Sequence, residues 1–177
     1  MSPASTGKTE VVAYPLRDDG AIPNNDRLPL LVYPSAVTPV SVDPALTFES
    51  LFRANGWAGT WRNGVYPFHH YHAEAHEVLG IASGEVTVLF GGEDGVTLTA
   101  KAGDVVVIPA GVGHKRVAMA GDLCVVGAYP PGQRPDMRRE DPDDRTYALT
   151  VIPTVPLPPA DPVYGGTGPL TVHWAEE

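Results

Sequence analysis

The chain has 177 residues, 43% of them hydrophobic, and a formal net charge of -9. This length corresponds to one domain with enough apolar residues for a core, and it leaves no room for a second catalytic domain. The 12 basic residues are scattered singly and form no stripe that could neutralise phosphates, which disfavours nucleic acid as a partner.

Other sequence features bear on the cellular compartment. No apolar run approaches the roughly 18 residues of a membrane-spanning helix, so we expect no membrane partner. The first residues, MSPASTGKTEVV, have neither the basic nor the apolar region of a signal peptide. The single cysteine, Cys124, fits a reducing environment, and its apolar neighbours favour a small buried side chain over a reactive thiol. We therefore expect a cytoplasmic protein.

Proline and glycine divide the chain into three parts. Between residues 45 and 129 there are thirteen of the 19 glycines but only two of the 19 prolines, Pro67 and Pro109. This composition is typical of short strands joined by tight turns, because glycine adopts the positive φ of turns and proline cannot donate to a ladder. We expect three parts: an extended N-terminal arm (1–42), a barrel with a preceding short helix (43–129), and a Pro-rich C-terminal extension packed on the barrel (130–177).

The N-terminal arm has prolines at 3, 15, 23, 29, 34 and 39. They are spaced too closely for a helix or a central strand, so we expect the arm to lie over the sheet or over a partner. Asp43-Pro44 then predicts the start of a helix, and Asn55-Gly56 predicts its end. Apolar residues recur at helical spacing between them, so residues 44–54 should form a short amphipathic helix on the core.

From residue 57 onward the hydrophobic period is two, which indicates strands. We expect them at 58–62, 65–72, 77–82, 85–90, 95–100, 104–108, 114–119 and 122–129, joined by glycine-containing turns such as 83–84 and 120–122. Eight short antiparallel strands predict a sandwich or a small closed barrel. Farther on, the mixed charges of 136–145 predict a solvated loop, and 151–174 an extended tail that packs its apolar residues on the barrel.

Four of the six histidines lie within eight residues, at His69, His70, His72 and His76. On a strand, His70 and His72 project to the same face, where two imidazoles can share one metal ion. Glu77 follows where the next strand would return, and His114 comes directly after a turn at 109–111. Three neutral imidazoles and a carboxylate suit one divalent ion, with Fe(II), Mn(II), Ni(II), Zn(II) and Cu(II) as candidates.

Two motifs in this region resemble those of the cupin family. Gly64, His70-Tyr71-His72, Glu77 and Gly84 match the first motif, and Gly103, Pro109-Ala110-Gly111 and His114 match the second. The cupin pattern ends in Asn where this chain has Ala118, which is not a ligand position. The resemblance covers residues 64–118. It implies an all-β fold, a small antiparallel barrel or double-stranded β-helix of the jelly-roll type, with four metal ligands facing its interior: His70, His72, Glu77 and His114.

The chain is also similar to a subgroup of small, functionally uncharacterised, single-domain bacterial cupins. The residues that carry this similarity are His69 to His72, Ala75 to Gly80, Gly127 to Pro130 and Asp161 to Gly165. The subgroup brings no reaction with it. The family resemblance implies a homodimer, which an open barrel edge and a Pro-rich arm also favour. Light scattering would contradict this expectation if it showed a monomer.

Four ligands leave two neighbouring positions of an octahedron open for a substrate. With Fe(II), the favoured metal, we expect a dioxygenase acting on a small polar or anionic metabolite. With Zn(II), Mn(II) or Ni(II), the same site suits an isomerase, a decarboxylase or a lyase. Glu77 either remains a ligand or detaches to act as the catalytic base, and the sequence does not choose. The alternative from another class is a cupin that binds or senses a small molecule without turnover.

The histidines also have structural interpretations. In a metal-free cupin, His70, His72 and His114 would hydrogen-bond in a polar lumen. His69 and His76 flank the proposed ligands, and the period of two directs His69 away from the site. We therefore expect both to support the ligands or to lie on the surface. The remaining histidine, at 173, is expected to pack or to be exposed.

Overall fold

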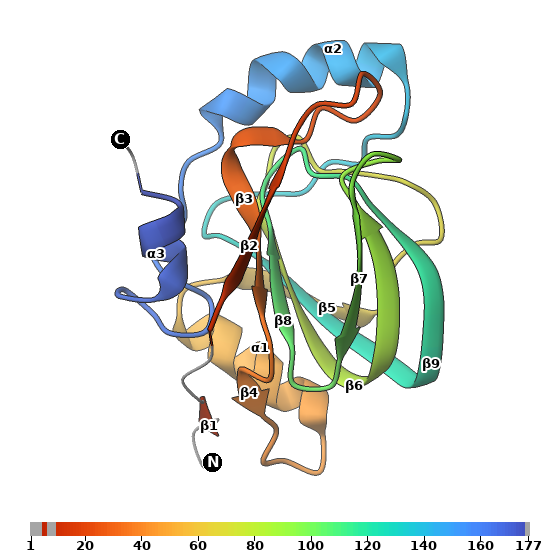
Figure 1. The fold of residues 1–177 in the computed structure, drawn as a ribbon. Coiled ribbons are helices and arrows are strands. Elements are labelled where there is room, and N and C mark those ends of the chain that lie inside the picture. The colour runs from red at the N-terminus through yellow and green to blue at the C-terminus, as the bar shows by residue number, and fades with distance from the viewer. Residues whose placement is uncertain (1–4, 7–9, 176–177) are drawn as a thin grey trace.

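The computed structural model describes residues 5–6 and 10–175, which form mostly antiparallel β-structure with few helices (Figure 1). The elements are β1 (Ser5–Thr6), β2 (Val12–Leu16), β3 (Asn25–Tyr33), β4 (Val37–Thr38), α1 (Pro44–Ala54), β5 (Ala58–Asn63), β6 (Glu77–Phe90), β7 (Val96–Lys101), β8 (Val105–Ile108), β9 (His114–Tyr129), α2 (Pro142–Val151), the 3-10 helix η1 (Ile152–Thr154) and α3 (Pro169–His173). Strands β1 and β4 form a two-stranded sheet, and the other seven form one larger sheet.

Strand β6 organises the larger sheet, because it pairs with three other strands. Residues 77–80 pair with β8, residues 85–90 pair with β7, and β9 pairs along the other edge from Val78 to Phe90. Beyond β8 lie β3 and β2, and beyond β9 lies β5. The expected antiparallel β-fold of cupin type is confirmed. The sheet is not closed, because its order ends with β2 on one side and β5 on the other.

Two pairs of predicted strands are in fact continuous. Strand β6 replaces the strands expected at 77–82 and 85–90, and β9 replaces those at 114–119 and 122–129. The segments predicted as turns, 83–84 and 120–122, face each other across β6 and β9, where the register of the pairing shifts. Gly84 has φ +74°, and a Cβ there would lie 2.7 Å from the Cα of Leu123. The glycines therefore serve bulges inside long strands and not turns between short ones.

A further correction concerns the prolines of the first 42 residues. The expectation that they exclude a central strand is wrong, because β3 contains Pro29 and pairs with β2 on one edge and β8 on the other. The register with β2 shifts between Tyr14 and Leu16, and pairing with β8 begins at Leu31. Pro29 thus lies where neither ladder requires its missing N–H. Its carbonyl accepts a hydrogen bond from Nε1 of Trp174 (2.9 Å).

The predicted helix at 44–54 is confirmed as α1. Its Phe48 and Phe52 are fully buried in one core cluster with Trp57 and Trp174. The helix lies directly against β6, since a Cβ on Gly80 would be only 2.3 Å from Cδ1 of Phe48. A second cluster, which includes residues from β3, β6 and β8, fills the other face of the sheet. Because side chains alternate along a strand, Val78 and Ala82 of β6 pack in the first cluster, and Leu79 and Ile81 pack in the second.

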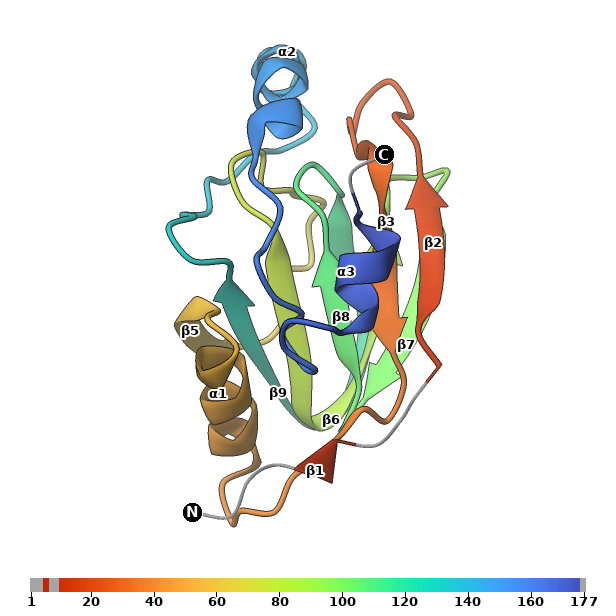
Figure 2. The same cartoon turned by 90° about the vertical axis from the view of Figure 1, so that its left-hand side faces the viewer.

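The chain after β9 is more ordered than the sequence indicates. The predicted solvated loop at 136–145 is wrong in its second half, because α2 begins at Pro142. Asp141 caps this helix by accepting hydrogen bonds from the backbone N–H groups of Asp143 (2.8 Å) and Asp144 (3.2 Å). The predicted extended tail contains η1 and α3. Helices α1 and α2 lie at opposite ends of the sheet, and α3 lies over β3 (Figure 2).

A buried carboxylate fastens the last segment to the sheet. Asp161 has no exposed surface and accepts a hydrogen bond from the hydroxyl of Tyr33 in β3 (2.7 Å). It also accepts from the backbone N–H groups of Val163 (2.8 Å), Tyr164 (3.0 Å) and Leu170 (3.0 Å). Most of these donors are buried and would lose their partner without the carboxylate, so Asp161 holds the loop before α3 in place.

We predict that Asp161→Ala lowers the free energy of unfolding by about 4 kcal/mol, because each buried donor left unpaired costs roughly 1–3 kcal/mol. Tyr33→Phe is the matched control. It removes one of the four hydrogen bonds and should cost only about 1–2 kcal/mol. Urea unfolding of the two variants measures the difference, and equal losses would contradict the role of Asp161.

Candidate metal centre

His70 and His72 lie on a loop and not on the strand predicted at 65–72. A pair of backbone hydrogen bonds joins this loop to the start of β9. The N–H of His70 donates to the carbonyl of His114 (3.3 Å), and the N–H of His114 donates to the carbonyl of His70 (2.9 Å). A single antiparallel bridge is thus enough to place two histidines of the loop beside the first residue of a distant strand.

The three histidines form a compact group. One ring nitrogen of each lies within 4.8 Å of those of the other two. All three side chains are buried, with 4%, 9% and 2% of their surface exposed for His70, His72 and His114. The group could hold a metal ion, and it is the set that the motifs of the sequence single out.

The ring orientation of each histidine is fixed by a backbone carbonyl. The Nδ1 atom of His70 lies 3.1 Å from the carbonyl oxygen of Phe68, and that of His114 lies 3.1 Å from the carbonyl oxygen of Val112. The Nδ1 atom of His72 makes the same type of contact with the carbonyl of Asp136. A carbonyl only accepts, so each Nδ1 carries a hydrogen and each Nε2 of a neutral ring keeps its lone pair for a metal.

Glu77 lies beside two of the histidines but not within the compact group of three. Its carboxylate oxygens are 3.4 Å from Nε2 of His72 and 3.5 Å from Nε2 of His114. As the first residue of β6 it faces the same side of the sheet as Leu79, and it is 3% exposed. The nearby Tyr129 hydroxyl accepts a hydrogen bond from Nε1 of Trp61 (2.8 Å), and its pKa is raised by burial and by the charge of Glu77. The carboxylate is held between His72 and His114.

Burial and charge shift the pKa values of this group in different directions. Burial lowers the pKa of His70 to about 3, and His114 adds to this effect. Burial alone would also lower the pKa of His72, but the charge of Glu77 and the hydrogen bonds to Glu77 and Asp136 together outweigh it and raise the pKa to about 9. Burial would raise the pKa of Glu77, yet His72 and His114 hold it below its usual range. His72 and Glu77 thus form an ion pair when no metal is bound.

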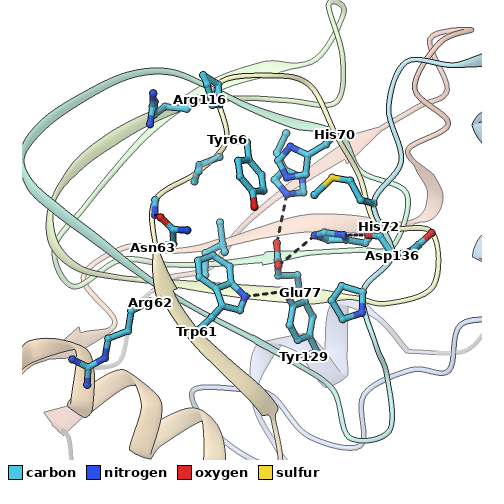
Figure 3. Close-up of a pocket in the computed structure, with 17 residues that line it drawn as sticks. Trp61, Arg62, Asn63, Tyr66, His70, His72, Glu77, Arg116, Tyr129 and Asp136 are labelled. Atoms are coloured by element: carbon cyan, nitrogen blue, oxygen red, sulfur yellow. Dashed lines mark hydrogen bonds and ion pairs between the residues drawn. The ribbon is translucent and has the colours of Figure 1, made fainter.

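A cavity of about 480 Å³ opens beside these residues (Figure 3). Its walls come from β5 and the loop after it, from β6 and β9, and from the segment 135–137 after β9. Apolar side chains, among them Trp61, Val65, Leu79 and Met137, make up much of the lining. A mostly apolar cavity with a few converging polar groups is typical of a small-molecule site.

His69 and His76 do not join the compact group. The Nε2 atom of His69 accepts a hydrogen bond from the N–H of Gly92 (3.1 Å), and Nδ1 of His76 accepts one from the N–H of Ala110 (2.8 Å). Both side chains are buried and support the loops around the site. This agrees with the expected supporting role and not with the expected surface position. His173 is exposed on α3. Cys124 is partly buried, and burial raises the pKa of its thiol.

Sequence reasoning missed the contribution of the segment 135–138. Pro135, Asp136 and Met137 line the cavity, and the carbonyl of Asp136 orients His72. Backbone hydrogen bonds of 3.0 Å in both directions between Tyr71 and Arg138 attach the segment to the histidine loop. Nothing in the local sequence marks this contact. Arg116 also lines the cavity, and its position two residues after His114 on one strand could have revealed it.

Comparison with known proteins gives the family. The family described as Cupin domain matches residues 61–126. The uncharacterized protein YjlB of Bacillus subtilis (strain 168) is 41% identical over 167 residues, which cover 94% of this chain and 98% of YjlB. The chain belongs to the cupin superfamily. The matched segment contains His70, His72, Glu77 and His114. Asp136, whose carbonyl orients His72, lies outside it.

Solved structures show weaker similarity. An acireductone dioxygenase from Bacillus anthracis, with a cadmium ion in its active centre, is 17% identical with a TM-score of 0.34, and the match covers 48% of this chain and 57% of that one. A DUF861 family protein from Thermotoga maritima is 26% identical with a TM-score of 0.32, covering 47% of this chain and 89% of that one.

Among the residues described, no helix is both long enough and apolar enough to cross a membrane.

We predict that metal binding releases a proton. Because the pKa of His72 is raised to about 9, this side chain is protonated at neutral pH, and a divalent ion at its Nε2 must displace the proton. The apparent affinity should therefore increase with pH up to about 9, above which His72 is neutral without a metal. Titration calorimetry with Zn(II) near neutral pH, in two buffers of different ionisation enthalpy, should give different heats. Identical heats would contradict a protonated His72.

Proposed function

We propose that the protein is a metal-dependent enzyme acting on a small polar or anionic metabolite. In this proposal His70, His72, Glu77 and His114 are the ligands of one divalent ion, with Fe(II) favoured. One observation carries the proposal. Three buried imidazoles have their Nδ1 atoms on backbone carbonyls, so that their Nε2 atoms are available beside a carboxylate and an open cavity.

The donor set fits such an ion. Metal–nitrogen bonds of about 2.1 Å place neighbouring donor atoms roughly 3 Å apart. The oxygens of Glu77 are 3.4 Å and 3.5 Å from the Nε2 atoms of His72 and His114, so only a small adjustment is needed. Three imidazoles with one carboxylate are suited to iron and to the other divalent transition metals.

A dioxygenase is the reaction class we favour. A bound iron would supply the template and the Lewis acid for attack of dioxygen on an electron-rich enolate or diol. The side chains contribute around it. Trp61 and Met137 limit water in the cavity, His72 and His114 hold Glu77, and Glu77 can accept a proton from a substrate that enters beside it.

Three expectations from the sequence remain predictions. They are the division of the chain at residues 42 and 129, the homodimer, and the cytoplasmic location. The segment after residue 129 is of special interest for the proposed reaction, since residues 135–137 line the cavity although they lie beyond the part of the chain that the family match covers.

The ligand assignment predicts how histidine variants bind metal. His72→Ala and His114→Ala should each lower the affinity for Fe(II) or Zn(II) more than about 100-fold, because each removes a donor from the ion. The control is His173→Ala, which changes an exposed histidine on α3 and should bind one ion per chain like the wild type. Metal analysis after gel filtration measures the stoichiometry, and circular dichroism checks the fold. Stoichiometric metal in both site variants would refute the assignment.

The reaction class predicts oxygen consumption. Iron-loaded wild type and His173→Ala should consume dioxygen with a member of a panel of diketones, catechols and 2-oxo acids, and His72→Ala should not. An oxygen electrode gives the rate. Conversion of a compound without oxygen uptake would instead favour an isomerase, decarboxylase or lyase. Binding without conversion would favour a protein that binds or senses the compound.

A further inference from the structure

One side of the cavity carries hydrogen-bond donors that have no partner in the described part of the chain. They are the guanidinium of Arg116 on β9, the hydroxyl of Tyr66 and the Nδ2 group of Asn63, all of which line the cavity. Figure 3 shows Arg116, Tyr66 and Asn63 on the side of the cavity away from His72 and Asp136. The cavity therefore has an uneven distribution of charge.

Arg116 differs from the other arginine that lines the cavity. Arg62 is paired with Glu49, with Nε to Oε1 at 2.8 Å, and with Asp43, with Nη2 to Oδ2 at 3.0 Å. Arg116 is only partly exposed, yet among residues 5–6 and 10–175 its guanidinium makes no ion pair or hydrogen bond. This is notable in a chain with 21 acidic and 12 basic residues. A guanidinium fork that is partly withdrawn from water is suited to a planar oxyanion.

The two neighbouring donors are held in position. The Oδ1 atom of Asn63 accepts a hydrogen bond from the N–H of Gly64 (2.9 Å), which fixes its amide. The ring of Tyr66 is stacked on Phe68, with centroids 4.9 Å apart, and meets the edge of His70 at 5.3 Å. Donors that are already oriented need little ordering when a ligand binds.

The carboxylates of the cavity lie on the other side. Glu77 is engaged by His72 and His114, and the Asp136 carboxylate accepts hydrogen bonds from Nε of Arg138 (2.8 Å) and from the N–H of Glu74 (2.9 Å). A free anionic group is therefore repelled near Glu77 and attracted near Arg116. His114 and Arg116 project to the same face of β9 and are about 7 Å apart along the strand.

We propose that Arg116, assisted by Asn63 and Tyr66, binds the carboxylate at one end of a substrate whose other end lies at the metal-binding histidines. The substrate is thus a small acid with a metal-chelating group and a second, distal carboxylate. Arg116 selects this class over neutral compounds of the same shape. The inference rests on the proposed function for the chelating end only, because the distal site consists of residues that are not metal ligands.

The test uses two acids that share a chelating group. Both 2-oxoglutarate and 2-oxopentanoate have five carbons and a 2-oxo acid end, but only the first has a distal carboxylate. Calorimetry on the Zn(II)-loaded protein should show that the wild type binds 2-oxoglutarate at least about tenfold more tightly. Arg116→Gln should remove this preference and leave the affinity for 2-oxopentanoate unchanged. The matched control is Arg134→Gln, an exposed arginine that does not line the cavity, and it should keep the preference.

A second measurement separates this inference from the proposed function. The arginine Nε–H resonance that is absent in Arg116→Gln should shift in the wild type on addition of 2-oxoglutarate and not of 2-oxopentanoate. If the protein holds no metal but this resonance shifts, the proposed enzyme chemistry fails and the anion site stands. If metal binds but the wild type shows no preference or binds neither acid, or Arg116→Gln keeps the preference, the anion site is refuted.

Discussion

The site depends on two backbone hydrogen bonds, those that join His70 and His114 in both directions (3.3 Å and 2.9 Å). They attach an irregular loop to the first residue of β9, and so bring together ring nitrogens from two distant parts of the chain. Glu77, the first residue of β6, is paired with Ile108 of β8, and its carboxylate lies beside both His72 and His114. Backbone pairing is well suited to this purpose, because it sets positions without using the side chains that a metal needs.

Around this centre, the cavity combines the cupin region with a segment that follows it. Asp136 orients His72 through its carbonyl, while its carboxylate is paired with Arg138. Glu77 is paired as well, whereas the donors near Arg116 have no side-chain partner among residues 5–6 and 10–175. The separation of charges within one cavity is a physical basis for orienting an asymmetric anion, with its chelating end at the histidines.

The elements of the fold that could be read from the sequence were those set by local rules. Helix α1 has both a start signal at Asp43-Pro44 and an apolar face, and it was placed correctly. The glycines at 83–84 and 120–122 were misread because turns and bulges need the same positive φ, and only the partner strand distinguishes them. Pro29 was misread for a similar reason, since the cost of its missing N–H depends on the register of both neighbouring strands.

The sequence by itself determined the cupin family and the residue types of the site, because each of the two motifs that contain His70, His72, Glu77 and His114 is contiguous in the chain. It even contained the carbonyls of Phe68 and Val112, each two residues before the histidine that it orients. Only the tertiary structure decided the third carbonyl, which lies 64 residues after His72 in the chain, and the wall of donors near Arg116. These contacts join segments that have no common periodicity, so only folding brings them together.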